Sequence, residues 1–435
     1  MKTTWYQRLM WTLIKLLRRR TWQKQYNIQI THHADLPPAP FVLVGNHAHR
    51  QDPYFVGVLM APTFSGQVIH YMANIDGVSK TQQKLANMVA AYGKKKGVPD
   101  FEAVKTTLTL VRNGSNVGIF PEGDRTWDGE TATIHPSTAA LLRKLCIPIV
   151  VAHFRGHYLS WPRWADHPAR GELRIDLSVI PEEHVRGISM TELQQRLQRE
   201  LYQNDVKDEE LQSVTFTATR RAAGIHRVLW YCPVCNAHNT LTAAADNEEM
   251  IHCTACDTRW TLSGNLRVTP AVQTTSAQLQ DLKDWMDWQR GTVTEELIAY
   301  LQSWKEDGGA ETTLGDSPTR PYTATPRVTL QNRYDQNGEI THTLIGTGTL
   351  TLYGDTLQLI TSDDSTDSSL GGGVPAGEVL FSADVRDISG FIDNFNSYGE
   401  FTHGNQRVRI EIDRGSYFKW IQLVDICQEL LGEDG

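Results

Sequence analysis

The 435-residue sequence lacks an uninterrupted apolar run of the roughly 20 residues that a membrane-spanning helix needs. Glycine (33 residues) and proline (18 residues) are too sparse for a collagen-like fibre. A composition of 40% hydrophobic and 21% charged residues also excludes a polytopic membrane protein and a wholly disordered chain. We therefore expect a globular protein.

Acidic residues are missing from the first 34 residues, although the whole chain carries a net charge of −8. These 34 residues contain seven Lys and Arg side chains, so they carry +7 and the remaining 401 residues carry −15. The overall acidity argues against a general nucleic-acid binder. A basic arm on an acidic body instead indicates an anionic partner for the arm alone, either a lipid surface or a nucleic acid.

Residues 5–20 separate into two faces when they are placed on a helix at ~100° per residue. One broad face is apolar, and a narrow opposite stripe is basic apart from Trp11. The basic residues of the stripe are Arg8, Lys15, Arg18 and Arg19. Such a helix lies on an anionic membrane, where each cation adds ~1 kcal/mol. The alternative is an amphipathic helix that packs on its own domain.

The membrane interpretation is favoured, so we expect a phospholipid surface and no nucleic acid as partner. A secretory signal peptide is the poorer interpretation, because no small-residue cleavage site follows the apolar stretch and the basic cluster lies after it. We therefore expect a peripheral or monotopic protein on the cytoplasmic side of the cell membrane.

Only six cysteines occur, and four of them form two CxxC pairs. Cys232 and Cys235 make the first pair, and Cys253 and Cys256 make the second, with 17 residues between the pairs. This spacing predicts a zinc ribbon, in which four thiolates bind one tetrahedral, structural zinc ion and leave no open position for catalysis. Acidic residues dominate the ribbon, so a structural or protein-docking role is favoured over nucleic-acid binding.

Buried-strand patterns alternate with helical patterns in the first half of the chain, which predicts an α/β domain. The strands are expected at residues 41–45, 117–120 and 147–153. The helices are expected at residues 53–60, 80–91, 100–112, 137–145 and 191–203. After the ribbon, residues 277–306 predict a helical pair or hairpin.

The last 115 or so residues change to alternating strand patterns. Leucines on both sides of Gly354 and Asp355 predict a hairpin, residues 408–412 alternate again, and residues 418–431 have helical spacing. Residues 361–377, rich in Ser, Asp and Gly, predict a mobile loop. Many short strands followed by one amphipathic helix resemble a pleckstrin-homology (PH) or GRAM-type barrel.

The length suggests roughly three domains, and the patterns divide the chain into five units. They are an amphipathic interfacial helix (1–24), an α/β domain (25–210), a zinc ribbon (225–265), a helical linker (270–310) and a C-terminal PH/GRAM-like domain (320–435).

Candidate catalytic residues follow the first predicted strand, in the run Asn46-His47-Ala48-His49-Arg50-Gln51-Asp52. Four residues separate His47 from Asp52, so one turn can bring the carboxylate to the imidazole. In such a pair the carboxylate fixes the tautomer while the imidazole accepts a proton. HxxxxD alone also occurs by chance, and an ordinary loop pair is the alternative.

A second motif, Phe120-Pro121-Glu122-Gly123-Asp124-Arg125, ends the strand predicted at residues 117–120. It lies at the carboxyl end of that strand, where α/β proteins place ligands, and Arg offers a planar fork for phosphate. NHxxxxD followed by FPEG-x-R resembles the glycerolipid acyltransferase family, of the 1-acylglycerol-3-phosphate acyltransferase type, over about residues 25–200. Residues 147–150 resemble the fourth block of that family.

The resemblance implies that residues 25–210 are an acyltransferase domain, in which His47 is the general base that deprotonates the acceptor hydroxyl and Asp52 orients it. It also implies a substrate-binding set for the glycerol phosphate of the acceptor. Its members are Lys96, Glu122, Gly123 and Arg125. The implied acyl donor is an acyl thioester of coenzyme A or of acyl carrier protein, which makes acyl carrier protein a candidate partner.

Three positions depart from the family pattern. His49 stands where a small hydroxyl residue is common, Lys96 replaces an Arg, and Asp124 replaces a Thr. We expect His49 to be a solvated loop histidine, with a second proton-transfer group as the alternative. The carboxylate of Asp124 is expected to repel the acceptor's phosphate unless it faces away.

These observations predict acyl transfer to 1-acylglycerol 3-phosphate, which yields phosphatidate. The nearer alternatives keep the chemistry and change the acceptor to glycerol 3-phosphate or another lysophospholipid. A different class of function is a non-catalytic membrane scaffold that recruits partners through the zinc ribbon and the C-terminal domain. The intact His47 and Asp52 favour the enzyme.

Overall fold

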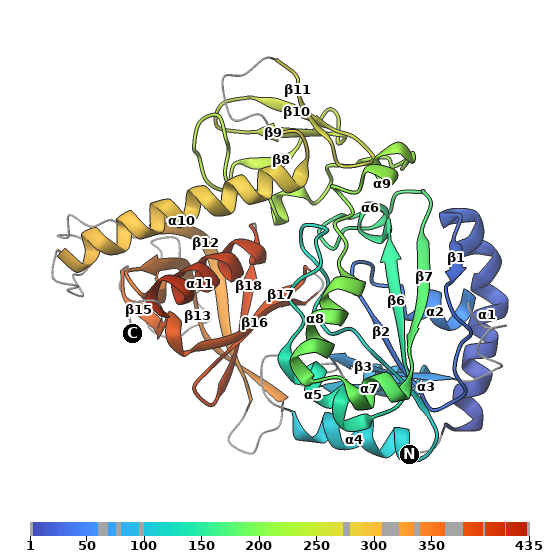
Figure 1. Cartoon of the computed structure of the whole chain (residues 1–435). Coiled ribbons are helices and arrows are strands. Elements are labelled where there is room, and N and C mark those ends of the chain that lie inside the picture. Colours follow the sequence, from blue (N-terminus) through green and yellow to red (C-terminus); the bar gives the residue numbers. More distant parts are fainter. Residues whose placement is uncertain are drawn as a thin grey trace.

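The computed structural model describes residues 3–59, 68–74, 80–94, 100–272, 279–306, 322–334, 340–361, 377–394, 396–413 and 415–432. They form an α/β domain, a small ribbon, and a β-rich region that a long helix joins to the ribbon (Figure 1).

A seven-stranded sheet with the order β1-β7-β6-β2-β5-β3-β4 forms the centre of the α/β domain. Neighbouring strands are parallel except β6 and β7, which are antiparallel. The strands are β1 (Gln29–His32), β2 (Val42–Gly45), β3 (Ile69–Asn74), β4 (Ala91–Lys94), β5 (Asn116–Ile119), β6 (Ile149–Arg155) and β7 (Arg174–Ile180).

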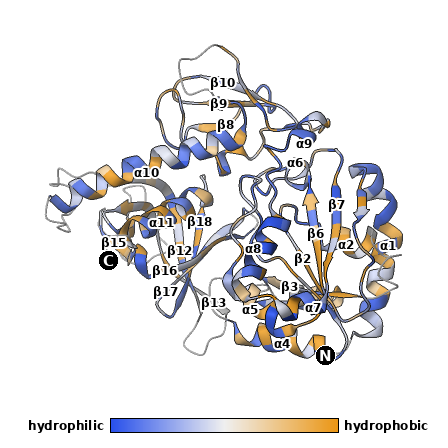
Figure 2. Ribbon diagram, in the orientation of Figure 1, coloured by the Kyte–Doolittle hydropathy of each residue, from blue (hydrophilic) through white to orange (hydrophobic). Residues whose placement is uncertain are grey.

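Apolar side chains cover both faces of this sheet. Val42 and Val44 of β2 belong to one buried cluster, and Leu43 belongs to another on the opposite face. A strand buried on both faces reads as an uninterrupted apolar run, and the central strands carry the hydrophobic colour in Figure 2. The helices of the domain are α2 (Asp52–Leu59), α3 (Lys80–Met88), α4 (Phe101–Arg112), α5 (Pro136–Leu145), α6 (His157–Ser160), α7 (Glu182–Gly187), α8 (Met190–Leu201) and α9 (Glu209–Ser213).

The strands and helices predicted for this domain are confirmed, with shifted ends. The helix predicted at residues 80–91 ends at Met88, because Ala90 takes a left-handed conformation (φ 62°) and Ala91 begins β4. The prediction also missed β1, β3, β4 and β7.

Helix α1 (Trp5–Tyr26) packs on the outside of the α/β domain, next to α2 (Figure 1). Trp11 and Trp22 are buried against the domain, and Trp11 Nε1 donates to the carbonyl of Val89 at 3.1 Å. The side chains of Leu16 and Leu17 are each 72% exposed. The helix thus packs on its own domain through one face and leaves apolar residues exposed on another.

None of the helices in the described ranges is both long and apolar enough to cross a membrane.

The ribbon contains a four-stranded antiparallel sheet with the order β11-β10-β9-β8. Its strands are β8 (Leu241–Ala243), β9 (Met250–Cys253), β10 (Arg259–Leu262) and β11 (Val268–Pro270), and the short 3-10 helix η1 (Ile225–Arg227) precedes them. Trp260 of the ribbon and Phe55 of α2 belong to the same buried cluster, so the ribbon and the α/β domain share a continuous core.

A single helix, α10 (Leu282–Glu306), follows the ribbon, so the predicted helical pair or hairpin at residues 277–306 is wrong for the described part of that range. The apolar helical spacing in the sequence is interrupted between Trp288 and Leu297, where most residues are polar. Gln289 and Val293 are buried within this stretch, and Gln289 accepts hydrogen bonds from the backbone N–H groups of Trp230 and Tyr231.

Seven antiparallel strands and the C-terminal helix α11 (Tyr417–Gly432) make up the β-rich region. The sheet order is β15-β14-β13-β12-β18-β17-β16. The strands are β12 (Tyr322–Tyr334), β13 (Ile340–Tyr353), β14 (Thr356–Ile360), β15 (Val379–Asp384), β16 (Ile388–Asn394), β17 (Tyr398–His403) and β18 (Gln406–Ile412), with the 3-10 helix η2 (Val385–Asp387) between β15 and β16.

The predicted hairpin is confirmed, because Leu350 pairs with Leu359 and Leu352 with Leu357. The predicted helix at residues 418–431 is confirmed by α11. The predicted loop at residues 361–377 lies outside the described residues apart from its two ends. Assignment of the β-rich region to the PH or GRAM class stays a prediction.

Candidate active site

Three neighbouring strands bring the candidate residues together. β2 lies between β5 and β6 and runs parallel to both, so the carboxyl ends of the three strands meet at one edge of the sheet. His47 follows β2, Phe120 and Glu122 follow β5, and His157 follows β6. The sequence motifs thus meet where α/β folds place ligands.

His47 and Asp52 form the expected contact. His47 Nδ1 lies 2.9 Å from Asp52 Oδ2, and the imidazole stacks on Phe120 with ring centroids 4.2 Å apart. Since Nδ1 donates to the carboxylate, Nε2 carries the lone pair, and Nε2 has no hydrogen-bond partner among the described residues. The imidazole side chain is 19% exposed, so a proton donor can reach it from solvent.

Asp52, the first residue of α2, is fully buried and is held by more than one partner. Its Oδ2 also accepts from the backbone N–H groups of Ala48 (3.0 Å) and His49 (2.9 Å), and its Oδ1 lies 2.6 Å from His157 Nδ1. Burial by itself raises the pKa of Asp52, but the charge and hydrogen bonds of His157 and His47 outweigh it and hold the pKa well below its usual range. The carboxylate therefore stays ionised and oriented.

His157 is the residue at this centre that the sequence motifs did not reveal. It belongs to the short helix α6, and the carboxylate of Asp205 accepts from the backbone N–H groups on both sides of it, Gly156 (2.9 Å) and Tyr158 (2.7 Å). The sequence could have indicated His157 through its position just after a buried strand. If that strand runs parallel to β2, the carboxyl ends of the two strands meet at one edge of the sheet.

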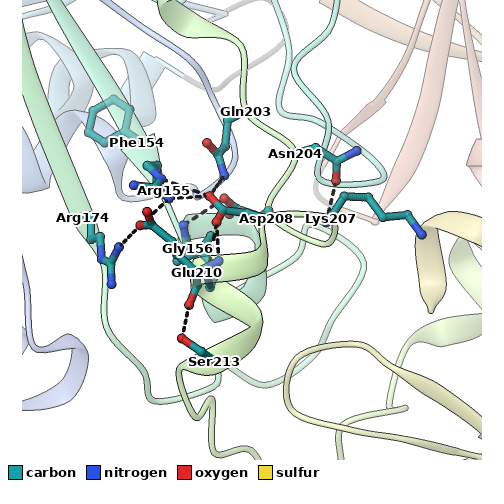
Figure 3. Close-up of polar contacts among 12 residues, drawn as sticks. Phe154, Arg155, Gly156, Arg174, Gln203, Asn204, Lys207, Asp208, Glu210 and Ser213 are labelled. Carbon is teal, nitrogen blue, oxygen red and sulfur yellow. Dashed lines mark hydrogen bonds and ion pairs between the residues drawn. The ribbon is translucent and has the colours of Figure 1, made fainter. Parts of the chain in front are cut away.

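An ion-pair network holds the crossing from β6 to α6 (Figure 3). Arg155 at the end of β6 pairs with Asp208 (2.7 Å) and Glu210 (3.0 Å), and Glu210 also pairs with Arg174 of β7 (2.6 Å). Gln203 donates to the same Asp208 oxygen at 2.9 Å. The network ties two strands to the segment that supplies Asp205, and so it supports the placement of His157.

The expectation that His49 is a solvated loop histidine is wrong, because its side chain is fully buried. Its ring packs edge-on against Tyr26 (5.7 Å) and Trp161 (5.5 Å), and its Nδ1 accepts from the backbone N–H of Gln51 at 3.0 Å. Burial lowers the pKa of His49 to about 3, so the imidazole is neutral at neutral pH. The helix α1, which carries Tyr26, supplies part of that cover.

Glu122 contacts the backbone of the catalytic segment. Its Oε1 accepts from the N–H of His47 at 2.7 Å, and its Oε2 accepts from the N–H of Ala132 at 2.8 Å. Burial raises the pKa of Glu122 to about 8. The hydrogen bonds from the backbone N–H groups of Ala132 and His47 lower this pKa, but burial has the larger effect. Both carboxylate oxygens are engaged, so the contacts tie the β5 segment to the segment that carries His47.

Gly123 and Arg125 follow in the same turn. Gly123 has φ 78°, a conformation that favours glycine, and it is exposed. Burial, followed by the charge of Arg163, lowers the pKa of Arg125 to about 10, while Asp124 and Asp393 oppose the shift. Asp124 pairs with Arg163 at 2.9 Å, so its charge is partnered within the chain. Lys96 lies outside the described residues.

A cavity of about 690 Å³ lies beside this centre, between α1 and the start of α2. Arg18 and Arg50 line it together with aromatic residues that include Trp22 and Trp161, and the guanidinium of Arg50 lies 4.0 Å from the Trp161 ring centroid. Neither arginine has an ion-pair partner among the described residues. The cavity thus combines cationic and apolar walls.

The four ribbon cysteines gather at one point, and their sulfur atoms lie within 4.8 Å of one another. Cys232 and Cys256 are 3.8 Å apart at sulfur, as are Cys235 and Cys253, which is too long for a disulfide. It is close to the sulfur separation in a tetrahedral site with Zn–S bonds of ~2.3 Å. Thr240 and Thr258 hydroxyls lie 3.3 and 3.2 Å from two of the sulfur atoms. This cluster could bind a zinc ion.

Residues 27–154 match the model of the acyltransferase family. Among solved structures, one similar protein is the 1-acyl-sn-glycerophosphate (LPA) acyltransferase PlsC from Thermotoga maritima. The two chains share 14% sequence identity, the match covers 48% of this chain and 82% of that chain, and the TM-score is 0.36. No curated protein was found that matches the chain.

Proposed function

We propose that the acyltransferase-family domain of this chain transfers an acyl group from a thioester to the free hydroxyl of a lysophospholipid, with 1-acylglycerol 3-phosphate as the acceptor and phosphatidate as the product. The observation that carries this proposal is the contact of His47 with Asp52 beside the FPEG segment, inside the residues that match the family. Glycerolipid acyltransferase activity is what the family supports, and the acceptor is our proposal.

In the proposed mechanism, His47 Nε2 takes the proton of the acceptor hydroxyl as its oxygen attacks the thioester carbonyl. The C–O bond forms, the C–S bond breaks, and the imidazolium returns the proton to the leaving thiolate. Asp52 keeps Nδ1 protonated and stabilises the imidazolium, and general-base assistance of this kind contributes typically 10²–10⁴-fold. No covalent acyl-enzyme is needed.

Arg125, Gly123 and Glu122 have separate roles in the proposal. Arg125 receives the phosphate of the acceptor, because a guanidinium fork matches phosphate oxygens. Gly123 lets the turn approach the acceptor closely, since no side chain intervenes there. Glu122 acts on the acceptor through the backbone of His47, given that its two oxygens are already engaged there and at Ala132. Lys96 stays a candidate second cation for the phosphate.

We further propose a peripheral lipid association through α1. Its exposed leucines and Arg18, which has no ion-pair partner in the part of the chain that the structure describes, suit an anionic membrane surface. The cavity beside it has the mixed cationic and apolar walls that a phospholipid needs. The ribbon cysteines would hold a structural zinc ion, and the donor is an acyl thioester of coenzyme A or acyl carrier protein.

The proposal is tested by incubating the purified full-length chain with labelled acyl-CoA and a panel of acceptors. The panel contains 1-acylglycerol 3-phosphate, glycerol 3-phosphate and lysophospholipids that carry larger headgroups. We expect labelled phosphatidate as the main product. If no acceptor is acylated from acyl-CoA or from acyl carrier protein, the proposed enzymatic activity is contradicted. The result would favour a non-catalytic membrane scaffold.

Arg125→Ala tests the phosphate role. We expect a KM for 1-acylglycerol 3-phosphate that is about 10- to 100-fold higher, because a charge-assisted contact to the phosphate contributes ~1.5–3 kcal/mol. Arg143→Ala, a change at the end of α5, serves as the matched control. An unchanged KM in the Arg125 variant would rule out this role.

A further inference from the structure

The segment 122–130, which we call the acceptor loop, follows β5 in the α/β domain but is contacted from the distant C-terminal half. Lys283 of α10 pairs with Asp128 at 3.1 Å. The ring of Phe418 in α11 lies 4.8 Å from the ring of Trp127. The acceptor loop is therefore partly enclosed by elements that lie outside the residues that match the acyltransferase family.

Arg163 connects the acceptor loop to the β-rich region from a position with only 1% side-chain exposure. Its Nη1 lies 2.9 Å from Asp124 Oδ2 and also donates to the carbonyl of Arg125 at 2.9 Å. Its Nη2 lies 3.3 Å from Asp393 Oδ2, and its Cζ lies 3.7 Å from the Trp127 ring centroid. One buried cation thus contacts three nearby residues of the loop and one carboxylate of the β-rich region.

Asp393 is equally buried, near the end of β16, with 1% side-chain exposure. Its Oδ1 accepts from the backbone N–H of Asn396 at 3.0 Å, and the amide of Asn396 donates to the carbonyl of Arg163 at 3.0 Å. Arg163 has two carboxylate partners, Asp124 and Asp393, and loss of the Asp393 charge would leave the buried guanidinium with Asp124 alone, which is unfavourable. The docking of the β-rich region and the position of the acceptor loop are therefore coupled.

We propose that the C-terminal β-rich region is part of the acceptor site, with Asp393 and Arg163 as positioning residues that hold the acceptor loop so that Arg125 meets the acceptor's phosphate. The identity of the ligand in this inference rests on the proposed function, whereas the coupling between Asp393 and the loop does not. The inference gives the β-rich region a role in acceptor recognition.

The test compares the full-length chain with Asp393→Asn, which keeps the shape of the side chain and removes its charge. We expect the KM for 1-acylglycerol 3-phosphate to rise at least about tenfold with a smaller fall in kcat, because Arg163 contacts Asp124, Arg125 and Trp127 of the loop, whereas His47 is still held by Asp52 and Glu122. Amide hydrogen exchange in residues 122–130 of the ligand-free protein should also become faster. Arg163→Lys keeps the charge but loses the fork, and it should give a smaller rise in KM.

Glu429→Gln is the matched control, since it removes a carboxylate of the same region that pairs with Arg290 at 2.8 Å, in a contact between α11 and α10. It should change neither KM nor exchange in the acceptor loop. If Asp393→Asn does not fold, Arg163→Lys is measured with the same two readouts and must show both effects.

Unchanged exchange in residues 122–130 of a folded Asp393→Asn protein would overturn the inference, as would an unchanged KM. If the wild-type chain transfers acyl groups to no phosphorylated acceptor, the proposed function fails, while faster exchange in the variant still supports the coupling and unchanged exchange still refutes it.

Discussion

At the scale of single residues, the contacts around Asp52 separate what short motifs can predict from what they cannot. The contact of His47 with Asp52 was predictable, because the two residues are only five positions apart and a single turn brings their side chains together. The contact of Asp52 with His157 spans 105 positions and depends on the order of β2 and β6 in the sheet. The burial of His49 likewise depends on α1 and on Trp161, which no local pattern specifies.

His49 makes a prediction about stability and pH. Its folded pKa of about 3 lies below the ~6.5 of an unfolded histidine, so between these values the unfolded chain binds a proton that the folded chain does not. The folded state therefore loses stability as pH falls, by about 2 kcal/mol at pH 5 from this residue. The variant His49→Asn retains a hydrogen-bond acceptor. Its free energy of unfolding in urea should fall by about 2 kcal/mol less than that of the wild type between pH 7 and pH 5.

Thr31→Asn, at an exposed position of β1 without a titratable side chain, is the control for this measurement and should show the same decline with pH as the wild type. If His49→Asn shows the same decline with pH as the wild type, the buried and neutral state of His49 is contradicted.

At the scale of single elements, the apolar periodicity of α1 predicted a helix but not which side faces the domain. Trp11, which lies within the basic stripe of the sequence pattern, is buried, while the leucines of the apolar face are exposed. The stripe that looked solvated therefore supplies the packing contact. The helix contacts the domain through a few large aromatic side chains. The apolar periodicity averages over all residues of the helix, so it does not show which few of them make the contact.

This arrangement predicts that membrane binding and folding can be separated within α1. The double variant Leu16→Glu and Leu17→Glu should lose co-sedimentation with vesicles of anionic phospholipid while its thermal midpoint is retained, because both side chains are exposed. Trp11→Ala should instead destabilise the protein by about 3–5 kcal/mol. Binding of the wild type should weaken with added salt. Wild-type binding by the double variant would contradict the membrane role of α1.

At the scale of the whole molecule, the five units expected from the sequence are less separate than their patterns suggested. Composition changes and CxxC spacing predicted a ribbon and a β-rich region, because those signals are local. The shared core of the ribbon and the α/β domain, and the buried pair of Arg163 with Asp393, join residues far apart in the chain. Only the tertiary structure shows such contacts.

The shared core leads to a prediction about zinc. Purified protein should contain about one zinc ion per chain, and Cys253→Ser should lose it and lower the thermal midpoint of the α/β domain as well as of the ribbon. The reason is that Cys253 and Trp260 of the ribbon belong to the same buried cluster as Phe55 and Phe154 of the α/β domain. Metal analysis and calorimetry measure both effects. Cys146→Ser, outside the cluster, should retain the metal, and wild-type protein without stoichiometric zinc would refute the site.

The turnover of His47→Ala, measured with labelled acyl-CoA and vesicles that contain 1-acylglycerol 3-phosphate, tests most directly whether His47 is the general base. We expect formation of labelled phosphatidate to fall by at least about 10³-fold, while the thermal midpoint and vesicle binding match the wild type. Undiminished turnover in the folded variant would contradict His47 as the general base.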